Sequence, residues 1–197
     1  MTPVTDVATS TPSASGSLRD RPLPSGSLRD RPVIVLDLGG QYARLIARRV
    51  RDLGSFSEVV RGSIEAPALA AMEPSARILS GGPASVYEDG APSVDPAIFE
   101  LGIPVLGICY GMQLMAQSLG GEVARTGAAE YGGTSLQRTG EDDSLLGVLE
   151  GTNTVWMSHR DAVTRAPEGA VVTATTDQTP IAAFEDRARQ LYAVQFH

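Results

Sequence analysis

Apolar and polar positions follow a strand-and-helix pattern from residue 33 to about residue 121. The run over 33–38 is almost continuously apolar and is followed by two glycines, which is typical of a buried parallel strand. From Tyr42 to Leu53 the apolar residues recur at helical spacing, and Gly54 follows where a helix would end. The same criteria predict further strands over 57–60, 77–80 and 104–109, and helices over 66–72, 97–101 and 110–119. This order of elements implies a mostly parallel sheet.

The pattern changes after Gly121. Short alternating runs predict strands over 134–138, 154–157, 171–175, 181–184 and 190–196, and only 144–149 has a helical pattern. We therefore expect an α/β fold: an open, mostly parallel central sheet with helices on both faces, extended by antiparallel or mixed strands in the second half. No linker interrupts residues 33–197, so we expect one domain there.

Residues 1–32 have a different composition. They are rich in Ser, Thr and Pro, and the octapeptide SGSLRDRP occurs twice, over 15–22 and 25–32. Such a segment buries too little apolar surface to offset its chain entropy, so we expect a disordered tail. A duplication in an unconstrained tail is the simplest interpretation, and a docking peptide is the alternative.

Composition and charge exclude several classes of protein. The chain of 197 residues carries 16 basic and 23 acidic side chains, and this acid excess does not suit a nucleic-acid binder. One cysteine and two histidines exclude a disulfide framework and argue against a metal centre. No apolar run is long enough for a membrane helix, and the N-terminus lacks the features of a secretory signal. We expect a cytoplasmic protein that binds neither membranes nor nucleic acid.

Cys109 is the first candidate for chemistry. It is the centre of a G-x-C-x-G sequence, Gly107 to Gly111, at a predicted strand-to-helix junction. This is the form of a nucleophile elbow with Cys in place of Ser, in which small flanking residues permit a sharp turn. The helix that follows would favour the thiolate. The alternative is a buried structural cysteine at the end of a core strand.

Two other segments end predicted strands and could meet Cys109. The sequence SGGP over 80–83 offers backbone N–H groups to an oxyanion, or is an ordinary turn. His197 ends the last predicted strand and could lie beside Cys109. Ligands of open α/β sheets bind beyond the carboxyl ends of the strands, where such segments gather.

Several motifs occur in an order that resembles the class I, triad-type glutamine amidotransferases, and more narrowly the amidotransferase domain of GMP synthases. They are DLGGQYARLIARRV from Asp37, SGGP from Ser80, GICYGMQLMA from Gly107, GG at 120–121, EYG from Glu130, WMSHRD from Trp156 and VQFH from Val194. The resemblance covers nearly all of 33–197 and nothing before it.

The resemblance implies a role for five residues. Cys109 would attack the side-chain amide of glutamine, and the backbone N–H groups of Gly82 and Tyr110 would form the oxyanion hole. Gln113 would help to position the substrate. His197 would protonate the leaving ammonia and then activate water against the thioester. No metal and no cofactor are implied for this part of the family.

The family pattern continues beyond its histidine with Pro and then a Glu that orients the histidine. The sequence stops at His197, so we expect a fragment that is weakly active or inactive by itself. The resemblance assigns ATP and Mg to an absent synthetase region, an ATP-pyrophosphatase domain of the same or a separate chain. It implies a homodimer only for the full-length protein.

Two other functions remain open. The chain could be another class I amidotransferase, of the anthranilate or carbamoyl phosphate type, although Gln41–Tyr42 and Trp156–Asp161 favour the GMP synthase type. It could also be a non-catalytic docking fragment, because the Glu is missing.

Some residues have a structural interpretation as plausible as a functional one. His159 is either structural or catalytic, and Trp156 and Met157 are expected in the core. The arginines of the first helix predict a solvated face, with an interface as the alternative; they are Arg44, Arg48, Arg49 and Arg51. Asp142 and Asp143 predict a loop and a helix N-cap and no calcium site.

Overall fold

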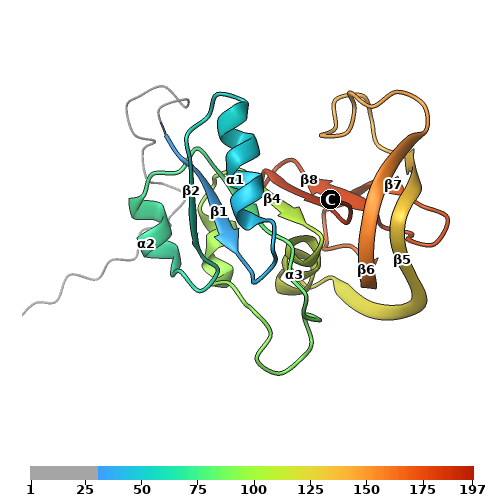
Figure 1. Ribbon diagram of the computed structural model, residues 1–197, viewed down its shortest axis with the longest axis horizontal. Coiled ribbons are helices and arrows are strands. Elements are labelled where there is room, and N and C mark those ends of the chain that lie inside the picture. Colours follow the sequence, from blue (N-terminus) through green and yellow to red (C-terminus); the bar gives the residue numbers. More distant parts are fainter. Residues whose placement is uncertain (1–30) are drawn as a thin grey trace, which may run out of the picture.

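Five parallel strands form the first half of a single nine-stranded sheet (Figure 1). The structure is a computed structural model, and it describes residues 31–197. In sheet order these strands are β2 (Ser57–Arg61), β1 (Val33–Asp37), β3 (Ala76–Leu79), β4 (Val105–Ile108) and β9 (Leu191–Val194). Each neighbouring pair is parallel, which confirms the fold class expected for the first half of the chain.

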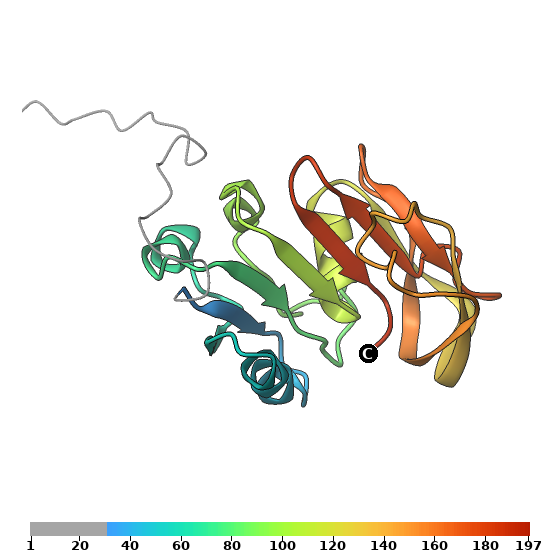
Figure 2. The same ribbon diagram turned by 90° about the horizontal axis from the view of Figure 1, so that it is seen from above.

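Antiparallel strands continue the sheet beyond β9. Their order is β8 (Ala183–Asp186), β7 (Val171–Thr175), β5 (Glu122–Arg138) and β6 (Asn153–Arg165). The β5–β6 pair is a long two-stranded ribbon at the end of the sheet, visible on the right of Figure 2. Both strands are much longer than the runs predicted from sequence, because their outer parts alternate too weakly to be recognised.

Helices cover both faces of the parallel strands, as expected. They are α1 (Ala43–Asp52), α2 (Ala66–Ala71), the 3₁₀ helix η3 (Pro96–Glu100) and α3 (Tyr110–Ser118). Ile34 and Leu36 of β1 face the larger core cluster, to which α2, η3 and α3 contribute. Val35 faces the opposite way and packs against Ala43 and Ala47 of α1. Strands buried on both faces explain the nearly continuous apolar run at the start of the domain.

Glycine at position 54 ends α1 in a left-handed conformation, with φ of 84°, as its position predicted. The predicted helix over 144–149, with its N-cap, is wrong. Isolated turns replace it, because Gly147 packs so closely against the preceding loop that a Cβ there would lie 1.8 Å from the carbonyl oxygen of Asp142. The aspartates of this loop form ion pairs: Asp142 with Arg138 and Asp143 with Arg187.

Arg31 and Pro32, the last two residues of the expected tail, contact the domain. The Arg31 side chain donates hydrogen bonds to the carbonyl oxygens of Glu73 at 2.8 Å and Pro74 at 2.7 Å. The backbone N–H of Ser75 donates to the carbonyl oxygen of Pro32 at 2.8 Å. Residues 1–30, with the first copy of the repeat and most of the second, lie outside the described residues, so the expected disorder of the tail stays a prediction.

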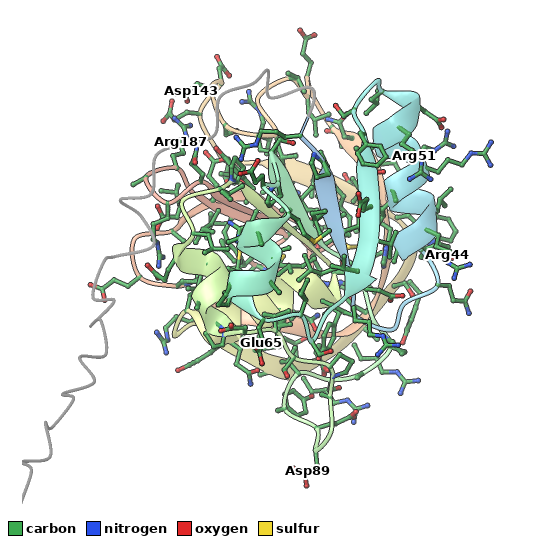
Figure 3. All side chains as sticks on the ribbon, turned by 90° about the vertical axis from the view of Figure 1, so that its left-hand side faces the viewer. Arg44, Arg51, Glu65, Asp89, Asp143 and Arg187 are labelled. Carbon is green, nitrogen blue, oxygen red and sulfur yellow. The ribbon has the colours of Figure 1, made fainter. Side chains whose placement is uncertain are left out.

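The arginines of α1 form the solvated face that the sequence predicted. Arg44, Arg48, Arg49 and Arg51 are all exposed. Arg51 also donates to the hydroxyl oxygen of Ser57 in β2 at 2.9 Å. Arg44 and Arg51 both project from the outer side of the helix (Figure 3).

Candidate active site

The backbone turns sharply at Cys109, between the end of β4 and the first residue of α3. Cys109 has φ of 51° and ψ of −106°, a conformation that side chains disfavour. The two flanking glycines make the turn possible. A Cβ at Gly107 would lie 2.7 Å from the carbonyl oxygen of Gly111, and one at Gly111 would lie 2.4 Å from that of Leu79. The strained strand-to-helix elbow expected from the sequence is therefore present.

The side chain of Cys109 is almost completely buried. The residue is 5% exposed, and its sulfur is 3.9 Å from the carbonyl oxygen of Ser158. Burial raises the pKa of the thiol to about 11, while the backbone N–H of Tyr110 and the Gln195 side chain act to lower it. The helix terminus was expected to favour thiolate, but burial outweighs it. The thiol therefore needs a base at neutral pH.

His197 lies across Gly81 from Cys109. A Cβ built on Gly81 would be 3.1 Å from Cε1 of His197 and 3.8 Å from Cβ of Cys109. The backbone N–H of His197 donates to the carbonyl oxygen of Trp156 at 3.0 Å, and its ring packs edge-on against Tyr42 with centroids 6.0 Å apart. Burial and the nearby His159 lower the pKa of His197. A neutral imidazole is thus available to accept a proton.

The SGGP turn packs against both Tyr110 and the end of β1. The Ser80 hydroxyl accepts a hydrogen bond from the backbone N–H of Leu38 at 3.0 Å and donates to the carbonyl oxygen of Gly81 at 3.0 Å. A Cβ at Gly82 would lie 2.6 Å from the carbonyl oxygen of Leu38 and 3.2 Å from the Tyr110 ring. Gly82 and Tyr110, the residues expected to supply the oxyanion hole, are therefore neighbours.

Gln113 is buried one turn into α3, and its amide is occupied by the protein. Its Nε2 donates to the backbone carbonyl oxygen of Asp161 at 2.7 Å and lies 3.1 Å from Oε1 of Gln195. The side chain thus organises the wall of the site. A direct contact between Gln113 and substrate stays a prediction.

All five residues singled out from the sequence line one cavity of about 620 Å³. These five residues are Gly82, Cys109, Tyr110, Gln113 and His197. The walls of the cavity are formed by the segments after β1, β3 and β4 and by the middle of β6. This volume suits a small polar metabolite. In the described part of the chain, no group of three or more His, Cys, Asp or Glu side chains is placed to hold a metal ion.

The buried polar network around Glu130 was not predicted from the sequence. Its carboxylate accepts from the Thr176 hydroxyl at 2.7 Å and from the Thr179 hydroxyl, and it lies 3.2 Å from Nε2 of His159. The other ring nitrogen of His159 lies 3.0 Å from the carbonyl oxygen of Asp161. These contacts give His159 a structural role at the cavity wall. A charged residue inside the EYG motif was the only signal in the sequence.

The WMSHRD block lies within strand β6, so its side chains alternate between the two faces. Met157 is fully buried, as expected, but Trp156 is 62% exposed, and its expected place in the core is wrong. The pleat explains the difference, because successive residues of a strand point to opposite faces.

Among residues 31–197, no helix is long and apolar enough to cross a membrane.

Comparison with known proteins agrees with this geometry. The family model described as Glutamine amidotransferase class-I matches residues 34–197. The chain belongs to this family. The structure of a Thermoplasma acidophilum protein, assigned to GMP synthase as one of its subunits, resembles this amidotransferase with a TM-score of 0.72 and 27% sequence identity. The match covers 85% of this chain and 83% of the Thermoplasma chain.

Curated relatives of this amidotransferase are longer proteins. GMP synthase [glutamine-hydrolyzing] from Parafrankia sp. is 58% identical over 165 residues, and the protein of the same name from Nocardia farcinica is 59% identical over 165 residues. In both cases the match covers 84% of this chain and 31% of the relative. The chain thus spans about a third of the length of the curated relatives that it matches.

Proposed function

We propose that this domain hydrolyses glutamine through Cys109. The observation that carries the proposal is the placement of a strained Cys109 and a neutral His197 on either side of Gly81 in one cavity. His197 takes the thiol proton, and the sulfur attacks the amide carbon of the glutamine side chain. The C–N bond then breaks as His197 returns the proton to the leaving nitrogen, so that ammonia departs and a thioester remains.

Water completes the cycle. His197 takes a proton from a water molecule, the resulting hydroxide attacks the thioester carbon, and the C–S bond breaks. His197 returns its proton to the sulfur as glutamate leaves, and the thiol is restored. In both halves the carbonyl oxygen becomes negative, and the backbone N–H groups of Gly82 and Tyr110 are the proposed donors to it. Rigid backbone donors of this kind stabilise such a charge without reorganisation.

We further propose that the ammonia aminates xanthosine monophosphate to give GMP. The names of the Parafrankia and Nocardia relatives support this assignment over the anthranilate and carbamoyl phosphate types. The amination would occur on an ATP-pyrophosphatase synthetase domain, of the same or a separate chain, which would bind ATP and Mg. We expect a homodimer for that full-length protein and a cytoplasmic location. The amidotransferase domain would contribute glutamine binding and ammonia release.

Covalent labelling tests the proposed nucleophile. A diazoketone analogue of glutamine should add to Cys109, the single cysteine of the chain, and intact-mass spectrometry should find one adduct. Glutamine should protect against labelling, and Cys109→Ser should remain unlabelled. A folded protein that gains no adduct, or gains one that glutamine does not suppress, would contradict the proposal and favour a non-catalytic docking role.

A chimaera tests the destination of the ammonia. Residues 33–197 would replace the matching segment of the Parafrankia GMP synthase, and GMP formation would be measured with glutamine and, separately, with ammonium. Both nitrogen sources should support GMP synthesis, and Cys109→Ala should abolish only the glutamine-dependent reaction. A chimaera with Cys109 intact that uses ammonium but not glutamine would show that this domain does not serve that synthetase.

A further inference from the structure

The orientation of the Gln195 amide follows from its neighbours. The carbonyl oxygen of Asp161 can only accept, so the Gln113 atom 2.7 Å from it must be the nitrogen. That nitrogen also lies 3.1 Å from a Gln195 side-chain atom, which must therefore be the oxygen. The NH₂ group of Gln195 consequently points away from Gln113.

This NH₂ group is buried and lacks a partner. Gln195 is 0% exposed, and its Nε2 is one of the few buried side-chain nitrogens and oxygens in residues 31–197 without a hydrogen bond. The rest of the residue is well held, since its backbone N–H donates to the carbonyl oxygen of Ala182 at 2.8 Å. A fixed donor without an acceptor is unusual in a protein interior and calls for an explanation.

Cys109 is the neighbour that can supply an acceptor. Gln195 directly follows β9, and the backbone N–H of Cys109 donates to the carbonyl oxygen of Val194 at 2.8 Å, so the two residues lie side by side at the ends of adjacent strands. Nε2 and the thiol are not joined by a hydrogen bond of normal distance and angle. The Gln195 amide is nevertheless close enough to the thiol to lower the pKa of Cys109. A neutral thiol is a weak acceptor, whereas a thiolate is a strong one.

We infer that Gln195 is a thiolate-stabilising side chain, whose Nε2–H donates to the sulfur of Cys109 once the thiol proton has left. The unpaired donor of the resting protein is then a dipole already oriented to stabilise the negative charge of the Cys109 thiolate. Gln113 is the positioning residue that holds this dipole in place through Oε1. The inference rests on the proposal that Cys109 is the nucleophile, but it concerns the ionisation of the thiol and can be measured without turnover.

The test uses the alkylation rate of the single cysteine, followed by intact mass at pH 8. Gln195→Met preserves length and removes the donor, whereas Gln195→Glu keeps an acceptor for Gln113 and places a carboxylate near the sulfur. Losing a hydrogen bond to an ion should raise the thiol pKa by about one to two and reduce the thiolate fraction about ten- to a hundredfold. Each remaining thiolate is more nucleophilic, so iodoacetamide should react about three- to tenfold more slowly.

Controls separate ionisation from access and from unfolding. Gln117→Met, an exposed change on α3, should leave the rate unchanged. Iodoacetamide and N-ethylmaleimide should slow by the same factor if ionisation is the cause, whereas a change of access would depend on the size of the reagent. Circular dichroism and the melting temperature confirm folding, and Gln195→Glu should react at least as slowly as Gln195→Met.

Two outcomes would overturn the inference. Unchanged alkylation rates in a folded Gln195→Met protein would show that Nε2 serves water or substrate and not the sulfur. A faster reaction of both variants would show that Gln195 only shields the thiol. Neither result depends on glutaminase activity, so failure of this inference is distinguishable from failure of the proposed function.

Discussion

The hydroxyl of Tyr87 donates a hydrogen bond to Oδ1 of Asp161 at 2.7 Å, and this contact joins the segment after β3 to strand β6. The Ser85 hydroxyl bonds the second carboxylate oxygen. The backbone carbonyl oxygen of the same aspartate accepts from Gln113. One residue therefore connects the loop after β3 with helix α3, which follows Cys109.

Asp161→Ala should weaken glutamine binding about tenfold, because both hydrogen bonds that hold the loop are lost. Protection of Cys109 against alkylation by increasing glutamine measures the effect. Tyr87→Phe removes one of the two bonds and should weaken binding less. Equal protection in the wild-type protein and Asp161→Ala would show that the loop does not contribute to the site.

Gly111→Ala should destabilise the protein by about 2 kcal/mol or more, although alanine normally favours a helix over glycine. The added Cβ would lie 2.4 Å from the carbonyl oxygen of Leu79, and backbone cannot move aside cheaply. Gly54→Ala is the matched control, since it meets nothing within 4 Å and only its φ of 84° is unfavourable. It should cost about 1 kcal/mol in urea unfolding. A larger loss at Gly54 than at Gly111 would contradict the close approach.

Glu130→Ala should cost about 3 kcal/mol or more of stability, because it removes the shared partner of His159, Thr176 and Thr179 in a buried site. Glu130→Gln keeps the shape and can exchange hydrogen bonds with all three, so about 1 kcal/mol is expected. Equilibrium unfolding in urea measures both. Similar values for the two variants would mean that loss of the carboxylate charge, and not loss of shape or of hydrogen bonds, decides the cost.

The lowered pKa of His197 predicts a dependence on pH. A histidine whose pKa is depressed by folding contributes stability above its unfolded value of about 6.5, and the contribution is lost as pH falls through the folded value. The melting temperature of the wild-type protein should therefore drop between about pH 7.5 and about pH 5 by more than that of His197→Gln. Parallel curves for the two proteins would show that His197 is not desolvated.

The parallel half of the fold was predictable because its signals are local. The apolar run at 33–38, the glycine at 54 and the elbow at Cys109 each specify their own backbone, and the neighbouring strand ends then gather the candidate residues at one edge. The segment Ser80–Pro83 could be assigned to the site because it follows β3, which ends at the same edge of the sheet.

The remainder depends on contacts that sequence spacing does not reveal. The sequence around Gly147 has a helical pattern, but Gly147 packs closely against a carbonyl oxygen of its own loop. Trp156 faces outward because strand β6 extends beyond its apolar run and its register with β5 decides which face each side chain takes. The partners of Glu130 are 29 to 49 residues away in sequence, so no local pattern marks its burial.

Strand β9 has a further consequence for the distance between Cys109 and His197. It is hydrogen-bonded in register to β4, with Ile108 opposite Val194, so Cys109 directly follows β4 while Gln195 and Phe196 separate the end of β9 from His197. A slip of one residue would turn the β9 side chains to the other face of the sheet, and a slip of two would move the end of β9, with the segment that carries His197, about 7 Å along the strand. The placement of His197 relative to Cys109 thus depends on the backbone hydrogen bonds between β4 and β9. An engineer who transplants the proposed chemistry to another parallel sheet should first copy the strand alignment, and only then the side chains.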